Sequence, residues 1–233
     1  MPIHAVLWDV DDTLFDYTGS DSAAALAHVE AEGLLSRFAS PQDALSRWRT
    51  VMAEQYARFT AGEIGFRDHR RERVRQFLHD PRLGDVQADA WFGRYVTRYE
   101  AAWTLFPDSL AALDALRDTH RHGVLSNASV RNQHRKLTRL GIRDRFEVFL
   151  CSDELGCAKP DPAAFLAACD ALRLPPGEVA YVGDRLDLDA EAAVAAGLAG
   201  IWLDRSGGAH AGSPPRVTVL TELPAVLEKL HHA

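Results

Sequence analysis

The sequence has few cysteines and no long apolar segment. Its three cysteines, in a chain of 233 residues, are Cys151, Cys157 and Cys169. Without a secretion signal, such cysteines are typical of buried thiols in a reducing cytosol rather than of disulfides or a zinc site. The apolar run at the N-terminus stops at Asp9, too soon for a signal peptide. No run approaches the roughly 20 residues of a membrane-spanning helix. These absences predict a cytoplasmic protein that is not embedded in a membrane.

Positive charge is also scarce, and lysine most of all. The 26 lysines and arginines are outnumbered by 33 acidic residues, which gives a formal net charge of −7 at pH 7. This balance disfavours nucleic acid or an anionic membrane surface as a partner. Only Lys136, Lys159 and Lys229 are lysines, so each is worth inspecting for a specific role. The length allows one large domain, or one domain with an insert.

Two hydrophobic patterns divide the chain. Between residues 19 and 103, apolar side chains recur every three or four residues, as at Trp48, Met52 and Tyr56, which predicts helices. Ser40-Pro41 supplies the N-cap and the first position of one of them. We expect a bundle of about four helices in this segment.

On both sides of this insert, short apolar strands alternate with helices. The expected strands are 5–8, 122–125, 147–151, 179–182, 201–203 and 217–220. A loop rich in glycine and proline is expected at 206–215. Strands separated by helices predict a doubly wound parallel sheet. The predicted fold is therefore a Rossmann-like α/β core, residues 1–18 and 104–233, with an inserted all-helical domain, residues 19–103.

Two carboxylates and a hydroxyl follow the first strand. Asp9, Asp11 and Thr13 alternate along an extended chain, so their side chains share one side. In an open α/β sheet, ligands bind at the carboxyl ends of the strands. Two carboxylates about 4 Å apart repel by ~4 kcal/mol at an effective dielectric constant near 20, so we expect a cation or a shared proton between them. Taken alone, the stretch is equally compatible with an acidic surface turn.

Polar residues follow other strands as well. Ser126 and Asn127 follow the second strand, Asp184 follows the fourth, and Lys159 lies in the loop after the third. A parallel sheet brings all of these ends to one edge. Each feature alone is compatible with a turn or a solvated charge. Polar residues after four strands of one sheet together indicate a functional site.

These residues resemble the four motifs of the haloacid dehalogenase superfamily of phosphohydrolases, subfamily I, in which a helical cap is inserted after the first strand. Residues 9–13, Asp-Val-Asp-Asp-Thr, match the first motif, Asp-x-Asp-x-Thr. Ser126 matches the second motif and Lys159 the third. Asp184 and Asp189 match the fourth, Gly-Asp-x-x-x-x-Asp. The resemblance implies the core fold of this superfamily with a helical cap.

The resemblance also implies catalysis through an aspartyl-phosphate. Asp9 is expected to attack phosphorus. Asp11 is expected to protonate the leaving group and then to deprotonate the attacking water. Thr13, the Ser126 hydroxyl and the Asn127 backbone N–H are expected to bind the phosphate.

Mg²⁺ is the expected cofactor, because it is a hard cation that prefers oxygen ligands. The resemblance assigns the Asp9 and Asp184 carboxylates and the Asp11 backbone carbonyl to the metal site, with Asp189 orienting the ligands. Lys159, counted among the catalytic residues, is expected to place a positive charge against both the phosphate and Asp9.

The predicted function is Mg²⁺-dependent hydrolysis of small phosphomonoesters of the nucleotide or sugar-phosphate type. The expected partner is a small phosphorylated metabolite, and the oligomeric state is left undetermined. A phosphoryl-transferring mutase stays open, because it uses the same four motifs. A haloacid dehalogenase is disfavoured by Asp11, which relatives with that chemistry lack. A receiver-type signalling module is disfavoured by the length of the chain and by its helical insert.

Overall fold

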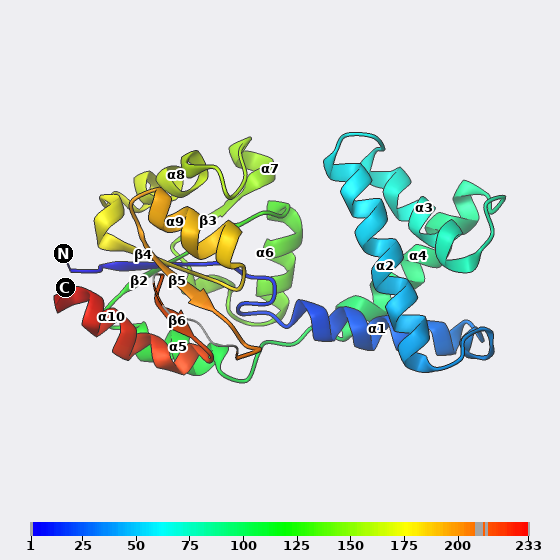
Figure 1. The fold of residues 1–233 in the computed structure, drawn as a ribbon, viewed down its shortest axis with the longest axis horizontal. Helices are drawn as coiled ribbons and strands as arrows, with labels where there is room; N and C mark the ends of the chain where they lie inside the picture. The colour runs from blue at the N-terminus through cyan, green and yellow to red at the C-terminus, as the bar shows by residue number, and fades with distance from the viewer. Residues whose placement is uncertain (1, 208–211, 213, 233) are drawn as a thin grey trace. The chain divides into compact units, whose positions relative to one another are not determined.

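The computed structural model describes residues 2–207, 212 and 214–232 (Figure 1). Within the loop predicted at 206–215, residues 208–211 and 213 lie outside the described residues. The chain forms two compact units, one made by residues 17–103 and the other by the segments on either side. Among the described residues, no helix combines the length and apolar character needed to cross a membrane.

The larger unit is built on a sheet that has six parallel strands in the described part of the chain, in the order β3-β2-β1-β4-β5-β6. The strands are β1 (Ala5–Trp8), β2 (Arg121–Ser126), β3 (Val148–Cys151), β4 (Val179–Gly183), β5 (Ala199–Leu203) and β6 (Arg216–Val217). Trp8 of β1 pairs with Val124 of β2 and with Val182 of β4. The predicted doubly wound parallel sheet is therefore confirmed, and β1, β2 and β4 end at the same edge.

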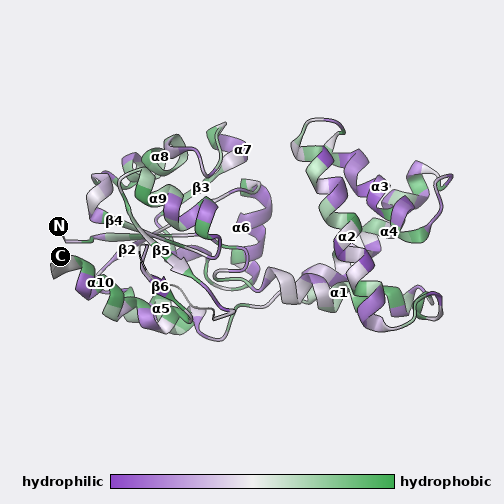
Figure 2. Cartoon of the chain, in the orientation of Figure 1, coloured by the Kyte–Doolittle hydropathy of each residue, from purple (hydrophilic) through white to green (hydrophobic). Residues whose placement is uncertain are grey.

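Helices cover both faces of the sheet, as buried parallel strands require. They are α5 (Ser109–Leu116), α6 (Val130–Arg139), α7 (Ser152–Leu155), α8 (Pro162–Leu172), α9 (Glu191–Ala195) and α10 (Leu223–His232). α8 and α9 belong to the apolar cluster that includes Leu7, Phe165 and Tyr181. Figure 1 shows α5 and α10 on the opposite side of the sheet. In Figure 2 the strands are largely hydrophobic, whereas α6 is mostly hydrophilic.

The last strand is shorter than predicted. β6 ends at Val217 rather than at Leu220. The Thr218 N–H donates to the Glu222 carboxylate, and the Leu220 N–H donates to the Asp108 carboxylate. These side chains take the donors that a strand would use, so the chain turns into α10.

The element after β4 begins as a π-helical turn, Leu186–Ala190, before continuing as α9. This turn packs directly on β5. A Cβ at Gly200 of β5 would lie 2.0 Å from the Ala190 carbonyl oxygen. Only glycine at this position lets the turn approach the sheet closely enough to bring Asp189 to the edge.

The smaller unit has its own apolar core. Its helices are α1 (Tyr17–Ala31), α2 (Pro41–Thr60), α3 (Phe66–Leu78) and α4 (Asp85–Ala101). As predicted, Ser40 caps α2: its hydroxyl accepts the Asp43 N–H at 3.0 Å, and Pro41 is the first helical residue. Trp48 packs against aromatic side chains of α3 and α4. Tyr56, from the same helical stripe, is exposed.

Candidate active site

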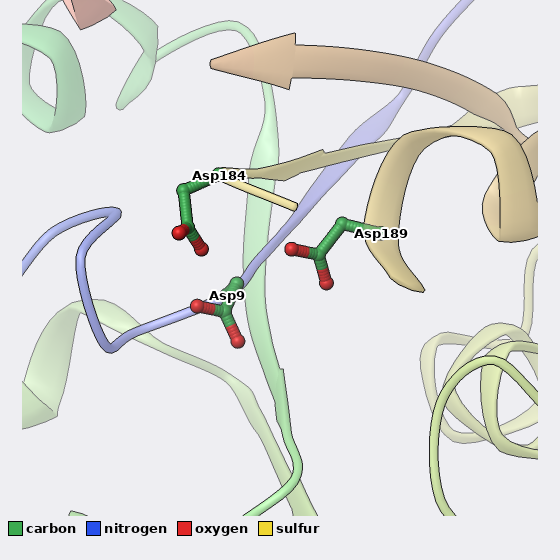
Figure 3. A group of neighbouring side chains, drawn as sticks. All are labelled: Asp9, Asp184 and Asp189. Atoms are coloured by element: carbon green, nitrogen blue, oxygen red, sulfur yellow. The ribbon is translucent and has the colours of Figure 1, made fainter. Parts of the chain in front are cut away.

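Three carboxylates gather at the edge where β1 and β4 end. Asp9 follows β1 directly, Asp184 follows β4, and Asp189 comes from the π-helical turn (Figure 3). One oxygen from each lies within 4.8 Å of the others. Three carboxylate oxygens at this spacing suit a hard divalent cation such as Mg²⁺. The Asp11 side chain does not belong to this group.

The charges of these acids are only partly compensated by protein groups. Burial raises the pKa of Asp9 from 3.8 to about 7, although Lys159 opposes this shift. Burial, followed by the charges of Asp9 and Asp189, raises the pKa of Asp184 from 3.8 to about 8. Both shifts disfavour the charged carboxylates. A bound cation would offset the same repulsion, so the electrostatics of the site fit a metal ion.

Lys159 supplies positive charge at the centre of the site. Its Nζ donates to Asp9 Oδ1 at 2.8 Å and to Asp189 Oδ1 at 2.6 Å. Burial alone would lower the pKa of this ammonium group, but Asp9 and Asp189 together raise it. Lys159 is therefore a buried, charged partner of two carboxylates.

Two further residues hold Lys159 in place. The Tyr181 hydroxyl accepts from Lys159 Nζ at 2.5 Å and donates to the Leu125 carbonyl at 2.9 Å. The Asn127 side chain accepts the Lys159 N–H at 2.8 Å and donates to its carbonyl at 2.7 Å. The Asn127 side chain therefore orients the loop that carries the lysine. Sequence reasoning missed Tyr181, because an aromatic residue in an apolar strand is indistinguishable from core.

Asp11 faces a different element from Asp9. Its Oδ2 accepts from Gln133 Nε2 at 2.7 Å, and its Oδ1 accepts from Lys136 Nζ. Both donors come from α6. Sequence reasoning did not identify either, although the scarcity of lysine singled out Lys136 for inspection.

The hydroxyls expected to bind phosphate also lie at this edge. Thr13 Oγ1 is 3.4 Å from Asp9 Oδ2, within reach of a hydrogen bond. Ser126 Oγ, at the end of β2, accepts from Gln133 Nε2 at 3.1 Å. The site residues predicted from the sequence thus lie after β1, β2 and β4, except that Asp189 lies in the π-helical turn and Lys159 lies between α7 and α8.

A family model described as haloacid dehalogenase-like hydrolase matches residues 3–197. The chain is 31% identical to phosphoserine phosphatase from Thermus thermophilus, over 78% of this chain and 67% of the relative. It is 27% identical to N-acylneuraminate-9-phosphatase from Rattus norvegicus, over 98% of this chain and 95% of the relative. It also resembles the crystal structure of 2-haloacid dehalogenase from Pseudomonas syringae pv. Tomato DC3000. The TM-score is 0.68 at 26% identity, covering 97% of this chain and 99% of that one.

Proposed function

Because the chain belongs to the haloacid dehalogenase-like hydrolase family, we propose that it is a Mg²⁺-dependent phosphohydrolase of small phosphomonoesters that works through an aspartyl-phosphate. One observation carries the proposal. The buried Asp9 carboxylate is paired with Lys159 and lies beside Asp184 and Asp189, while the Asp11 carboxylate accepts hydrogen bonds from side chains of α6. A nucleophile, a cation site and a second acid are what a phosphomonoesterase of this kind needs.

Asp9, Asp184 and the Asp11 backbone carbonyl would hold the metal, with Asp189 orienting these ligands through its bond to Lys159. When bound, Mg²⁺ would neutralise phosphate charge and align the phosphoryl group. The raised pKa values of Asp9 and Asp184 mean that protein groups alone do not fully stabilise their charged forms. A cation bound between the two carboxylates would stabilise those charged forms, which supports a metal site here.

The residues divide the work of two successive displacements. The Asp9 carboxylate attacks phosphorus and replaces the alkoxide, which takes a proton from Asp11. Thr13, Ser126 and the Asn127 N–H bind phosphate oxygens at the strand ends. Lys159 favours the ionised form of Asp9 against the effect of burial and offsets the charge of the incoming phosphate. Water then attacks the aspartyl-phosphate and restores Asp9.

The proposed substrates are small phosphorylated metabolites, with nucleotides and sugar phosphates ahead of phosphoproteins. Two relatives named above are phosphatases of small molecules, phosphoserine and N-acylneuraminate 9-phosphate. We propose that residues 19–103 form the cap that selects the leaving group. The compact helical unit at 17–103, with its own core, supports this assignment. The three free cysteines suit a cytoplasmic location.

Two other reactions remain distinguishable by experiment. One alternative is dehalogenation, because a haloacid dehalogenase shares the fold. Family members with that chemistry are expected to lack the second aspartate of the first motif, whereas this chain has Asp11. A phosphoryl-transferring mutase would use the same motifs with a sugar hydroxyl in place of water as the acceptor. It would therefore yield an isomeric phosphate ester instead of inorganic phosphate.

The test is phosphate release from p-nitrophenyl phosphate by the purified protein, with Mg²⁺ and then with excess chelator. We expect turnover with the metal, loss in chelator and recovery when Mg²⁺ is restored. Asp9→Asn is the matched inactive variant. Full activity in chelator would contradict the metal assignment. Halide release from a 2-haloacid, without phosphate release from any ester, would contradict the reaction itself.

A further inference from the structure

Two buried polar side chains of α6 have no role in the proposed mechanism. This helix is mostly hydrophilic (Figure 2), yet its Gln133 and Lys136 are only 1% and 6% exposed. They are three residues apart and therefore lie on one face of the helix. Lysine and glutamine are seldom buried so completely without specific partners. Their burial points to a specific role at the site.

Two residues that follow β1, Asp11 and Phe15, contact the buried ammonium group of Lys136. Its Nζ donates to Asp11 Oδ1 and lies 4.3 Å from the centre of the Phe15 ring. A buried ammonium without such partners would be strongly destabilising. Of the three lysines in the chain, two therefore lie at the candidate active site, each paired with one aspartate of the first motif.

Gln133 completes the arrangement around Asp11. Its Nε2 donates to Asp11 Oδ2 at 2.7 Å and is 3.1 Å from Ser126 Oγ. Each Asp11 oxygen thus accepts a hydrogen bond from a different side chain of α6. Rotation of the carboxylate would break at least one of these bonds, so the two donors restrict it to a single orientation.

The two hydrogen bonds fix where the Asp11 carboxylate oxygens lie at the site. We propose that Lys136 and Gln133 are positioning residues that hold the Asp11 carboxylate for the second displacement, hydrolysis of the aspartyl-phosphate. This inference rests on the proposed phosphohydrolase function and adds to it the residues that orient the base.

A water oxygen attacks phosphorus, the bond between phosphorus and the Asp9 oxygen breaks, and its electron pair returns to the Asp9 carboxylate. The proton lost by the water passes to Asp11. That proton is the one Asp11 donates to the next leaving group, so the enzyme returns to its starting state with inorganic phosphate released.

The experiment separates this step from the first one. p-Nitrophenolate is a good leaving group, so formation of the aspartyl-phosphate from its ester needs little help from an acid. In Lys136→Met we expect a rapid burst of p-nitrophenol followed by slow turnover. Phosphoenzyme should accumulate above the wild-type level when the reaction is quenched in acid. The steady-state rate should fall by about 10- to 100-fold, the range typical of residues that orient ligating groups.

Lys229→Met is the matched control, because Lys229 is exposed on α10 and lies outside the site. It should behave as wild type. Lys136→Arg keeps the positive charge and a donor and should restore part of the rate. In an Asp11→Asn background, Lys136→Met should cause no further loss, since the group it positions is already gone.

Gln133→Leu provides a second variant with the same expected accumulation of phosphoenzyme, and it tests the proposal if Lys136→Met does not fold. A proportional fall of burst and turnover, with no extra phosphoenzyme, would show a merely structural role and overturn the inference. If the wild-type protein hydrolyses no phosphate ester, the proposed function fails and this inference fails with it. A hydrolytic wild type with unchanged variants contradicts the positioning role alone.

Discussion

Gly183 and Asp189 approach each other so closely that a Cβ at position 183 would lie 2.3 Å from the Asp189 carboxyl carbon. Asp189 bonds to Lys159 and to the Arg185 N–H. The absence of a side chain at the end of β4 therefore makes room for the carboxylate that orients Lys159. The glycine of the fourth motif is therefore needed for the ion pair between Asp189 and Lys159.

Gly183→Ala should displace Asp189 and weaken the hold on Lys159. We expect a higher Mg²⁺ concentration for half-maximal activity and a lower maximal rate, measured by titrating Mg²⁺ against phosphate release. Gly93→Ala is the matched control, because a Cβ there meets nothing within 4 Å and the residue lies in α4. It should leave activity unchanged and stabilise the protein by about 0.4–1 kcal/mol. An unchanged Mg²⁺ dependence in Gly183→Ala would contradict this role of the glycine.

Asp11→Asn should lose activity in a way that depends on the leaving group. General acid–base catalysis typically contributes ~10²–10⁴-fold, and alkyl phosphates need protonation of the alkoxide more than aryl phosphates do. We therefore expect the larger loss for an alkyl ester, measured as kcat/KM for matched alkyl and aryl phosphates. Equal losses for the two esters would argue against Asp11 as the acid.

The stability of the metal-free protein should fall as pH rises from about 4 to about 8. Asp9 and Asp184 have pKa values raised from 3.8 to about 7 and about 8 in the folded state. In this range the unfolded chain has released protons that the folded protein still binds, so rising pH favours unfolding. Melting temperatures across pH 5–9 in chelator measure the effect.

Mg²⁺ should reverse that loss most strongly near pH 8, because it binds the ionised carboxylates and only the folded protein presents them together. Asp184→Asn should flatten the pH dependence and reduce the stabilisation by Mg²⁺. A melting temperature that rises with pH in chelator, or that is insensitive to Mg²⁺ at pH 8, would contradict this account of the carboxylates.

Arg205→Lys should destabilise the larger unit by about 1–3 kcal/mol, as expected when hydrogen bonds to a charged group are lost. The Arg205 guanidinium donates to both oxygens of Asp108 at 3.0 and 3.1 Å and to the Thr13 carbonyl at 2.8 Å. It also stacks 3.7 Å from the centre of the Phe106 ring. Lysine cannot make the same planar, forked set of bonds.

Urea denaturation measures this change. Arg58→Lys is the control, because the Arg58–Glu63 pair is largely solvent-exposed and such pairs contribute about 0–1 kcal/mol. Equal effects of the two substitutions would show that the bonds of Arg205 do not stabilise the fold.

Exchange of residues 19–103 for the cap of a relative with a different substrate should change substrate choice and leave the metal requirement intact. The reason is that the proposed phosphate and metal ligands all lie outside this segment. A panel of phosphorylated metabolites, assayed before and after the exchange, measures the effect. A folded chimera that keeps the original preference would show that residues 19–103 do not select the substrate.

The sequence predicted the doubly wound sheet well, because each buried strand appears as a short apolar run followed by a polar residue. Ser40-Pro41 likewise identified the start of α2, since capping depends on neighbouring residues only. β6 was overestimated, because Glu222 and Asp108 take its donors from outside the strand. Asp108 is 112 residues from Leu220 in the sequence, so a local pattern does not reveal that contact.

The sequence by itself determined which chemistry the site residues can perform and, through alternation of strands and helices, that Asp9, Ser126, Lys159 and Asp184 come to one edge. Only the tertiary structure decided how those groups are paired. Gln133 and Lys136 lie on a hydrophilic helix, where polar residues are expected at the surface. Tyr181 lies in an apolar strand, where an aromatic residue is expected in the core, so the hydropathy pattern does not identify any of the three as a site residue. They reach Asp11 and Lys159 only after the helices pack on the sheet, because hydrogen bonding depends on distances of a few ångströms that residue type and spacing do not specify.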